Sequence, residues 1–163
     1  MTRLERLSPE AYKPYGDVLS AEAARAFREA NQGTAKRFDR MAELKNLRPG
    51  ASPNLSVFRC APKKLPVDIR VLERHAHSTQ VFLPLSQPAR YLAAVCLGGD
   101  APDLSTLRAF LIEGPVGISY RPGVWHHPMT ALDRETDFAC LVWEDGGPGD
   151  CELLDLKRPF SLA

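Results

Sequence analysis

Residues 65–80 read LPVDIRVLERHAHSTQ. In the first half of this stretch an aliphatic residue stands at every second position: Leu65, Val67, Ile69 and Val71. Successive side chains of a β-strand point to opposite faces, so the alternation predicts a strand with one buried face. If the strand stays regular, Glu73 and His75 lie on that same face, and the strand would point a carboxylate and an imidazole inward.

A carboxylate in that position has two interpretations. Burying an unpaired charge is unfavourable, so an inward Glu73 needs a cationic partner, a metal ion or a substrate. Alternatively, the strand leaves the core after Val71, and Glu73 and His75 lie at a solvated strand end. Periodicity alone does not decide between the two.

The rest of the chain favours many short strands. The strand-like segments are 54–60, 80–85, 91–97, 117–121 and 138–143. Turn sequences rich in Gly, Pro and Asp separate them, as at 98–100 (GGD), 121–123 (RPG) and 145–149 (DGGPG). Short strands with such turns in a small chain predict a mainly β sandwich or barrel.

Two stretches have helical character. Residues 21–30 (AEAARAFREA) are rich in good helix formers and end at Asn31-Gln32-Gly33, a suitable C-terminal cap. Residues 103–112 (DLSTLRAFLI) can begin at an Asp103 cap, although a strand from Leu107 onward explains the same residues equally well. We therefore expect few and short helices.

The composition indicates one ordinary globular domain over residues 1–163. The 21 Lys and Arg residues nearly balance the 20 Asp and Glu residues, which gives no electrostatic reason to expect nucleic acid or an anionic membrane as a partner. The N-terminal residues carry no apolar run typical of a secretory signal, and no segment is long and apolar enough to span a bilayer. The four cysteines are far apart and predict buried thiols in the cytoplasm.

A second group of chemically active residues lies at 120–128 (YRPGVWHHP). Adjacent residues of a strand face opposite sides, so only one of His126 and His127 can point into a given site. Taken alone, this segment is better explained by one core histidine and one surface histidine.

Considered together, the two groups resemble the metal-binding motifs of cupin barrels. Those motifs are His-x-His-x(3,4)-Glu followed by Gly-x-x-His. Here the first motif becomes Glu73-x-His75 with Gln80 in place of the glutamate, and the second is Gly123-x-x-His126. A carboxylate, two imidazoles and an amide oxygen form a ligand set for a divalent transition metal. The literal His75-Ala76-His77 lacks the following glutamate, so we interpret His77 as a peripheral residue.

Longer strings resemble one family. They are Leu72-Glu73-Arg74-His75, Thr79-Gln80-x-Phe82-x-Pro84, Pro102–Phe110 (PDLSTLRAF) and Gly123–Pro128 (GVWHHP), and they are similar in order and spacing to ureidoglycolate lyases over nearly the whole chain. Family members commonly carry proline where this chain has Ala76, and His77 is not part of the pattern.

The resemblance implies a cupin-like β-barrel (double-stranded β-helix) with a few short helices, and a homodimer. It implies elimination of urea from ureidoglycolate to give glyoxylate, in allantoin and purine catabolism. It favours nickel as the divalent metal, with manganese or zinc as alternatives, and no organic cofactor. Another metal-dependent cupin enzyme and a non-catalytic cupin that binds a small acid are the competing functions.

Roles for single residues follow from this chemistry. Glu73, His75 and His126 are the candidate catalytic residues, and with Gln80 they are the candidate metal ligands. Without a metal, His75 or His126 is the candidate general base, because imidazole titrates near neutral pH. The guanidinium fork of arginine binds both oxygens of a carboxylate, and the candidates for the substrate carboxylate are Arg37 and Arg59. Tyr120 is a candidate hydrogen-bond partner of the ureido group.

Overall fold

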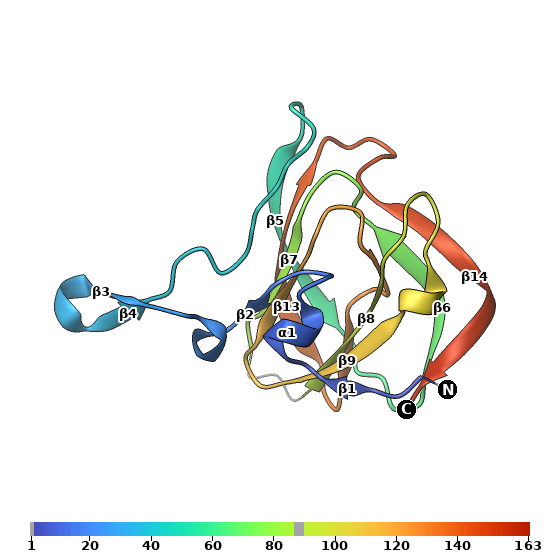
Figure 1. Cartoon of the computed structure of the whole chain (residues 1–163), viewed down its shortest axis with the longest axis horizontal. Coiled ribbons are helices and arrows are strands. Elements are labelled where there is room, and N and C mark those ends of the chain that lie inside the picture. The colour runs from blue at the N-terminus through green and yellow to red at the C-terminus, as the bar shows by residue number, and fades with distance from the viewer. Residues whose placement is uncertain (1, 87–89) are drawn as a thin grey trace.

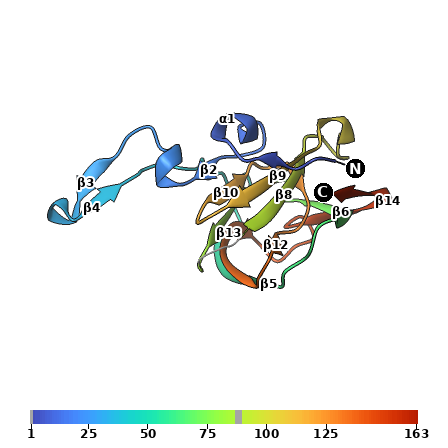
Figure 2. The same ribbon diagram turned by 90° about the horizontal axis from the view of Figure 1, so that it is seen from below.

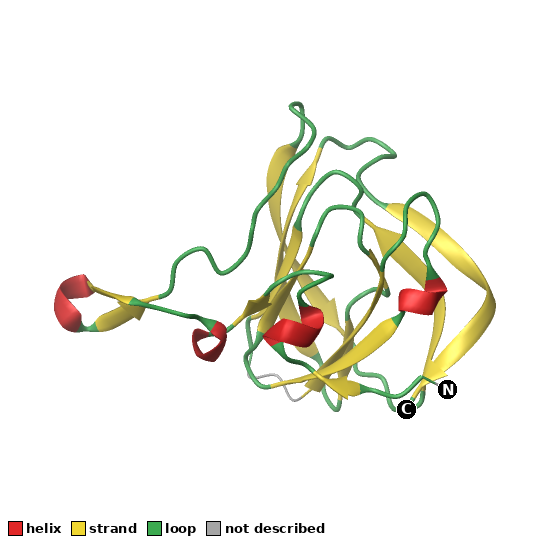
Figure 3. Ribbon diagram, viewed as in Figure 1, coloured by secondary structure: helices red, strands yellow, loops and turns green. Residues whose placement is uncertain are grey.

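The computed structural model describes residues 2–86 and 90–163, and most of them belong to two β-sheets (Figures 1 and 3). One sheet has seven strands in the order β1-β9-β8-β11-β6-β14, with β12 paired to β8. Its strands are β1 (Glu5–Arg6), β6 (Val67–Arg74), β8 (Arg90–Cys96), β9 (Arg108–Glu113), β11 (Trp125–His126), β12 (Thr130–Leu132) and β14 (Glu152–Leu162).

The other large sheet has five strands in the order β2-β10-β7-β13-β5. Its strands are β2 (Val18–Leu19), β5 (Ser52–Cys60), β7 (Gln80–Pro84), β10 (Gly117–Tyr120) and β13 (Thr136–Glu144). The chain crosses repeatedly between the two sheets, since β6, β8, β9 and β11 belong to the first and β7 and β10 to the second. The two sheets enclose a common interior (Figure 1), and the expected mainly β barrel with a few short helices is confirmed.

Two apolar clusters lie on opposite faces of the seven-stranded sheet. Strand β8 shows this alternation, because Tyr91, Ala93 and Val95 pack with Phe82 and Phe138 in the barrel interior. The intervening Leu92, Ala94 and Cys96 pack on the other face with Leu72 and Trp125. A strand buried on both faces reads as a nearly continuous apolar run, as β8 does.

The regular alternation expected along β6 breaks in the middle of the strand. Val67 and Ile69 pack with Leu72 in the outer cluster, so the buried positions change from odd to even numbers. The pairing of β6 with β14 shifts register at the same point, between Asp155 and Phe160. Glu73 therefore faces the barrel interior, opposite to the Val67 and Ile69 face. The expectation that these aliphatic residues share a face with Glu73 was wrong.

The helical expectations were only partly met. Residues 21–30 form one 3-10 turn (η1, Ala21–Ala23) and the short strand β3 (Arg28–Ala30), because propensity alone does not maintain a helix that packs on nothing. Asp103 caps as expected, accepting a hydrogen bond from Ser105 N, but it opens a single 3-10 turn (η3, Leu104–Thr106). Strand β9 follows, which confirms the strand interpretation. The one α-helix among the described residues is α1 (Pro9–Tyr12).

The cysteines only partly match the expectation of buried thiols. Cys96 and Cys140 are buried and Cys60 is half-buried, and all four are free. Cys151, however, is exposed, because it lies in the turn that precedes β14 rather than within a strand facing the core.

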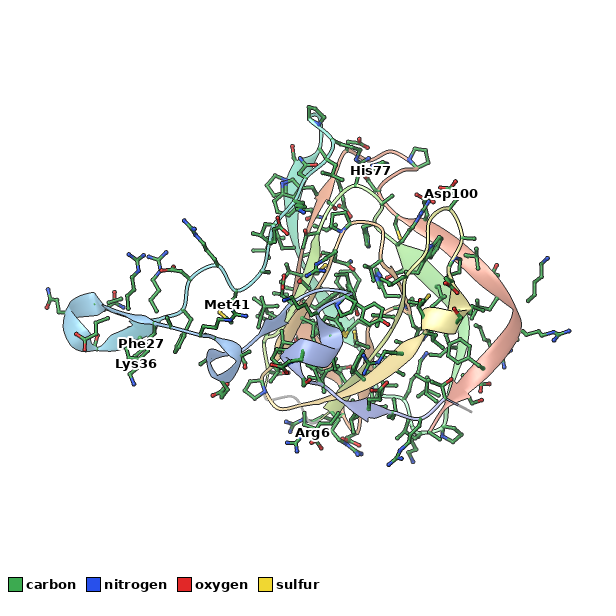
Figure 4. The ribbon with its side chains drawn as sticks, viewed as in Figure 1. Arg6, Phe27, Lys36, Met41, His77 and Asp100 are labelled. Carbon is green, nitrogen blue, oxygen red and sulfur yellow. The ribbon has the colours of Figure 1, made fainter. Side chains whose placement is uncertain are left out.

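Residues 24–41 extend away from the barrel as an arm (Figures 1 and 2). The arm contains β3, the turn η2 (Asn31–Gly33) and β4 (Ala35–Arg37). Within the described part of the chain, β3 and β4 pair only with each other. The aromatic rings of Phe27 and Phe38 lie 6.0 Å apart, and Lys36 covers Phe27 (Figure 4). Phe27 is still 51% exposed.

The described residues include no helix with the length and apolar character that a membrane crossing requires.

The outer cluster generates a stability prediction. Leu72 is fully buried, so Leu72→Ala leaves a cavity and should lower the free energy of unfolding by about 2–5 kcal/mol. The matched control is Leu153→Ala on the neighbouring strand β14, where the side chain is 69% exposed and the change should stay within about 0.5 kcal/mol. Urea denaturation followed by fluorescence measures both. Equal effects would contradict the assignment of Leu72 to the core.

Candidate metal centre

The register of three strands brings Glu73 and His126 together. His126 on β11 lies directly opposite Glu73 on β6, and its other neighbour in the sheet is Val95 on β8, which packs in the barrel interior. Side chains directly opposite each other in an antiparallel pair share a face. The Arg121-Pro122-Gly123 turn places β11 in this register, and Gly123 adopts a φ of +81°, a conformation that favours glycine.

His75 completes a compact cluster with these two residues. It follows the last residue of β6, and its ring stacks near that of His126 with 5.8 Å between centroids. Glu73 Oε1 lies 3.4 Å from His126 Nε2. One potential ligand atom from each of Glu73, His75 and His126 lies within 4.8 Å of the others. Metal–ligand bonds of about 2 Å require ligand atoms within about 4 Å of one another, so the three side chains would close in slightly around a bound ion.

Both imidazoles are held by backbone carbonyls. His75 Nδ1 lies 2.7 Å from Asp150 O, and His126 Nδ1 lies 2.9 Å from Val124 O. A carbonyl only accepts hydrogen bonds, so each Nδ1 carries the proton and each Nε2 carries a lone pair. Both Nε2 atoms are buried and have no hydrogen-bond partner among the described residues. This orientation is typical of histidines that bind a metal, so the residues fit a divalent ion.

Electrostatics favour the protonation states in which Glu73 and His75 can bind a metal. Burial opposes ionisation of Glu73, but the contact with His126 and the charges of His126 and His75 outweigh it and lower the Glu73 pKa. Burial and the neighbouring His126 lower the pKa of His75. At neutral pH Glu73 is therefore a carboxylate and His75 is neutral.

Gln80 and Tyr120 lie on the facing sheet. They are directly opposite each other on β7 and β10, and both are buried. The Tyr120 ring stacks on His126 with 3.9 Å between centroids and 7° between planes. Gln80 Oε1 and the Tyr120 hydroxyl are buried without a hydrogen-bond partner within the described part of the chain. Burial raises the pKa of Tyr120, so its hydroxyl stays protonated.

The two arginines expected at the substrate carboxylate lie elsewhere. Arg59 on β5 pairs with Asp137 on β13 through two contacts of 2.9 Å. Asp137 alternates with the inward-facing residues of β13, so Arg59 faces away from the interior. Arg37 lies on β4 of the arm and pairs with Asp39 at 2.6 Å. Within one chain neither arginine joins the cluster, and both expectations are corrected.

Near the cluster, Arg74 and His77 match their expected orientation. Arg74 points away from Glu73 and His75, since its guanidinium contacts Glu152 and covers the Trp125 ring. His77 is exposed in the turn after His75, at the end of the barrel shown at the top of Figure 4. His127 is not part of the metal-ligand cluster, but it is buried, with its Nδ1 3.0 Å from Val71 O, so the expectation of one surface histidine was wrong.

Sequence reasoning missed the residues around the turn at 145–151. The Cys151 thiol lies 4.0 Å from Glu73 Oε2; although the residue as a whole is exposed, partial burial of the thiol and the nearby Glu73 carboxylate raise its pKa to about 11. The Asp150 carbonyl that fixes His75 gives no signal in the sequence, because every residue has a carbonyl. Only the Gly-rich turn composition marks this segment as unusual.

The barrel and its cluster of two imidazoles and one carboxylate define a β-barrel protein with a candidate metal centre. The family profile described as ureidoglycolate lyase matches residues 1–163. The chain therefore belongs to the ureidoglycolate lyase family, and it is an enzyme of the lyase class.

Similar proteins agree with this family. A ureidoglycolate lyase from Burkholderia cepacia is 43% identical over 162 residues, covering 98% of this chain and 89% of the relative. One from Escherichia coli K12 is 40% identical over 147 residues, covering 90% and 89%. A solved structure of RmlC from Streptococcus suis in complex with dTDP-D-xylose covers 89% of this chain and 74% of that chain, at 12% identity and a TM-score of 0.41. A likeness at that level carries no argument.

The cluster generates a metal-binding prediction. His126→Ala removes a ligand atom and should weaken Ni²⁺ binding by about tenfold or more, measured by calorimetric titration of chelator-treated protein. His77→Ala is the matched control, because His77 is exposed and lies two residues beyond His75. Unchanged affinity in His126→Ala, or an equal loss in both variants, would place the ion elsewhere.

Proposed function

We propose that this lyase eliminates urea from ureidoglycolate and releases glyoxylate, as a step of allantoin and purine breakdown. The observation that carries the proposal is the convergence of Glu73, His75 and His126 inside the barrel of a ureidoglycolate lyase family member. The substrate carbon bears a hydroxyl, a carboxylate and the ureido nitrogen. Its hydroxyl proton leaves, the C–N bond breaks, a carbonyl forms, and the ureido nitrogen takes a proton. No water is consumed.

Glu73, His75, Gln80 and His126 are the proposed ligands of a divalent metal. Two imidazoles with carboxylate and amide oxygens suit a borderline ion, so nickel is proposed, with manganese and zinc as alternatives. A bound ion supplies Lewis-acid binding of the substrate hydroxyl and carboxylate, which lowers the pKa of the hydroxyl. Carboxylate binding by a metal ion suits this site, because neither Arg37 nor Arg59 reaches into it. When no ion is bound, His75 or His126 is the proposed base, through its free Nε2.

Tyr120 and Gln80 are the proposed contacts of the ureido group. The Tyr120 hydroxyl is a neutral, unpartnered donor beside His126, suited to a nitrogen that gains negative charge as it leaves. When Gln80 Oε1 does not bind an ion, it is an unpartnered acceptor opposite Tyr120, suited to an N–H group of urea. Together they would hold the leaving group against the wall formed by β7 and β10.

A product assay tests the function. Incubation of the pure protein with ureidoglycolate should give glyoxylate and urea in equal amounts. Ammonia in place of urea would indicate hydrolysis, and neither product would indicate a binding protein. His126→Ala should lower kcat/KM by about a hundredfold or more, as expected for loss of an acid–base or charge-stabilising group, while His77→Ala should stay near the parent value. Near-normal turnover in His126→Ala would remove this residue from the mechanism.

We also propose that residues 1–163 act as one cytoplasmic domain that forms a homodimer through the arm. An isolated two-stranded hairpin is at best marginally stable in water, and the arm pairs with no other strand of residues 2–86 and 90–163. The outer face of the five-stranded sheet is apolar and bare, with Leu55, Val57 and Leu83 exposed by 73%, 63% and 42%. Strand β5 also ends that sheet without a partner on its outer side. In a twofold-symmetric dimer, the arm and this face would be covered in both copies at once.

The dimer is tested by sedimentation velocity. The wild-type protein should sediment as a dimer at micromolar concentration, and Val57→Glu should shift it towards monomer, because a charge would be buried in the interface. Leu104→Glu is the control, since Leu104 is 47% exposed on η3, outside the five-stranded sheet. A monomeric wild type, or a dimer unaffected by Val57→Glu, would contradict this interface.

A further inference from the structure

We propose that Arg48 is a positioning residue of the metal centre, acting through Asp150 on the orientation of His75. The inference rests on the proposed metal centre and adds a residue that contacts neither ligand nor substrate. Its basis is a continuous set of contacts from Arg48 to the imidazole.

The side chain of Arg48 closes the turn between β13 and β14. Its exposed fraction is only 19%. Nη1 donates to Asp145 Oδ2 at 2.9 Å, and Nη2 contacts Asp150 Oδ1 and lies 3.4 Å from Trp143 O. One guanidinium therefore ties both ends of the turn to the end of β13.

Asp150 connects this turn to the cluster. Its carboxylate accepts hydrogen bonds from Asp145 N at 3.0 Å and from Gly146 N at 2.8 Å, in addition to Arg48. Its backbone oxygen lies 2.7 Å from His75 Nδ1. The carboxylate thus fixes where the residue sits, and the carbonyl of the same residue fixes the imidazole.

The backbone around Arg48 is fixed on the other side of His75. Leu47 N donates to His77 O at 2.8 Å, and Thr79 N donates to Lys45 O at 2.9 Å. The segment that carries Arg48 is therefore tied to the turn that follows His75, while its side chain holds the turn that contains Asp150. His75 lies between two segments that Arg48 connects.

This connection determines which nitrogen can bind a metal. Only the Nδ1–H tautomer leaves a lone pair on Nε2, and only a fixed acceptor at Nδ1 maintains both that tautomer and the ring orientation. If Arg48 merely stabilised an exposed turn, its removal would lower stability without altering the ring of His75.

The test compares two arginines that make similar pairs. Arg48→Ala is compared with Arg59→Ala, because Arg59 also pairs with a carboxylate, Asp137 on β13, but faces away from the cluster. Two measurements are made on the full chain: Ni²⁺ affinity by calorimetric titration after chelation, and the protonated nitrogen of His75 by ¹⁵N NMR without metal. A His75→Gln variant assigns the signal.

We expect Arg48→Ala to weaken Ni²⁺ binding by about tenfold or more and to give a mixture of His75 tautomers. Arg48→Lys should partly recover the Ni²⁺ affinity and the Nδ1–H tautomer of His75. Arg59→Ala should leave the affinity and the tautomer unchanged. Parent affinity with a pure Nδ1–H tautomer in Arg48→Ala would overturn the proposal, as would equal changes in Arg59→Ala.

Two further outcomes are decisive. If Arg48→Ala does not fold, Asp150→Asn takes its place, because it keeps the carbonyl but loses the charge that Arg48 binds; an unchanged His75 there overturns the proposal. If the wild type binds no Ni²⁺, the proposed metal centre fails, and the tautomer measurement still decides the role of Arg48.

Discussion

The structure of the site depends on one constraint: two buried imidazoles each donate Nδ1–H to a backbone carbonyl, that of Asp150 for His75 and that of Val124 for His126. These hydrogen bonds direct both Nε2 atoms into the barrel, where Glu73 lies opposite His126. Neither Nε2 atom has a hydrogen-bond partner among the described residues, and leaving buried polar atoms unpaired costs free energy. Gln80 Oε1 and the Tyr120 hydroxyl on the facing sheet are unpartnered as well, and this concentration of unpaired buried atoms marks the site.

The facing sheet contributes to the same constraint from the other side. Tyr120 stacks flat on His126, so the ring cannot tilt without displacing a fully buried phenol. His126 is thus fixed by its own strand register, by the Val124 carbonyl and by an aromatic neighbour. His75 lies beyond the end of β6 and, apart from its stacking near His126, depends on turns, which makes it the more easily disturbed of the two imidazoles.

Much of the fold and the core of the site could be predicted from the sequence, because both depend on local patterns. Strand periodicity and Gly/Pro turns indicated a β-sandwich or barrel, and the resemblance to cupin motifs indicated the cluster of Glu73, His75 and His126. The change of face within β6 could not be predicted, since it comes from a register shift against β14, almost 90 residues away in the chain. The orientation of Arg59 could not be predicted either, because it follows from the pairing of β5 with β13. The structure of the arm could not be predicted because a helix there would have had no packing partner to stabilise it.

The thiol of Cys151 beside Glu73 bears on which ions the centre prefers. With its pKa raised to about 11, the sulfur holds its proton at neutral pH, and a protonated thiol is a poor ligand. A thiolate there would draw soft ions such as Cu(I) to the mouth of the barrel. In the metal-free protein the donors offered at neutral pH are therefore nitrogen and oxygen, and an ion that recruits the sulfur must first displace its proton.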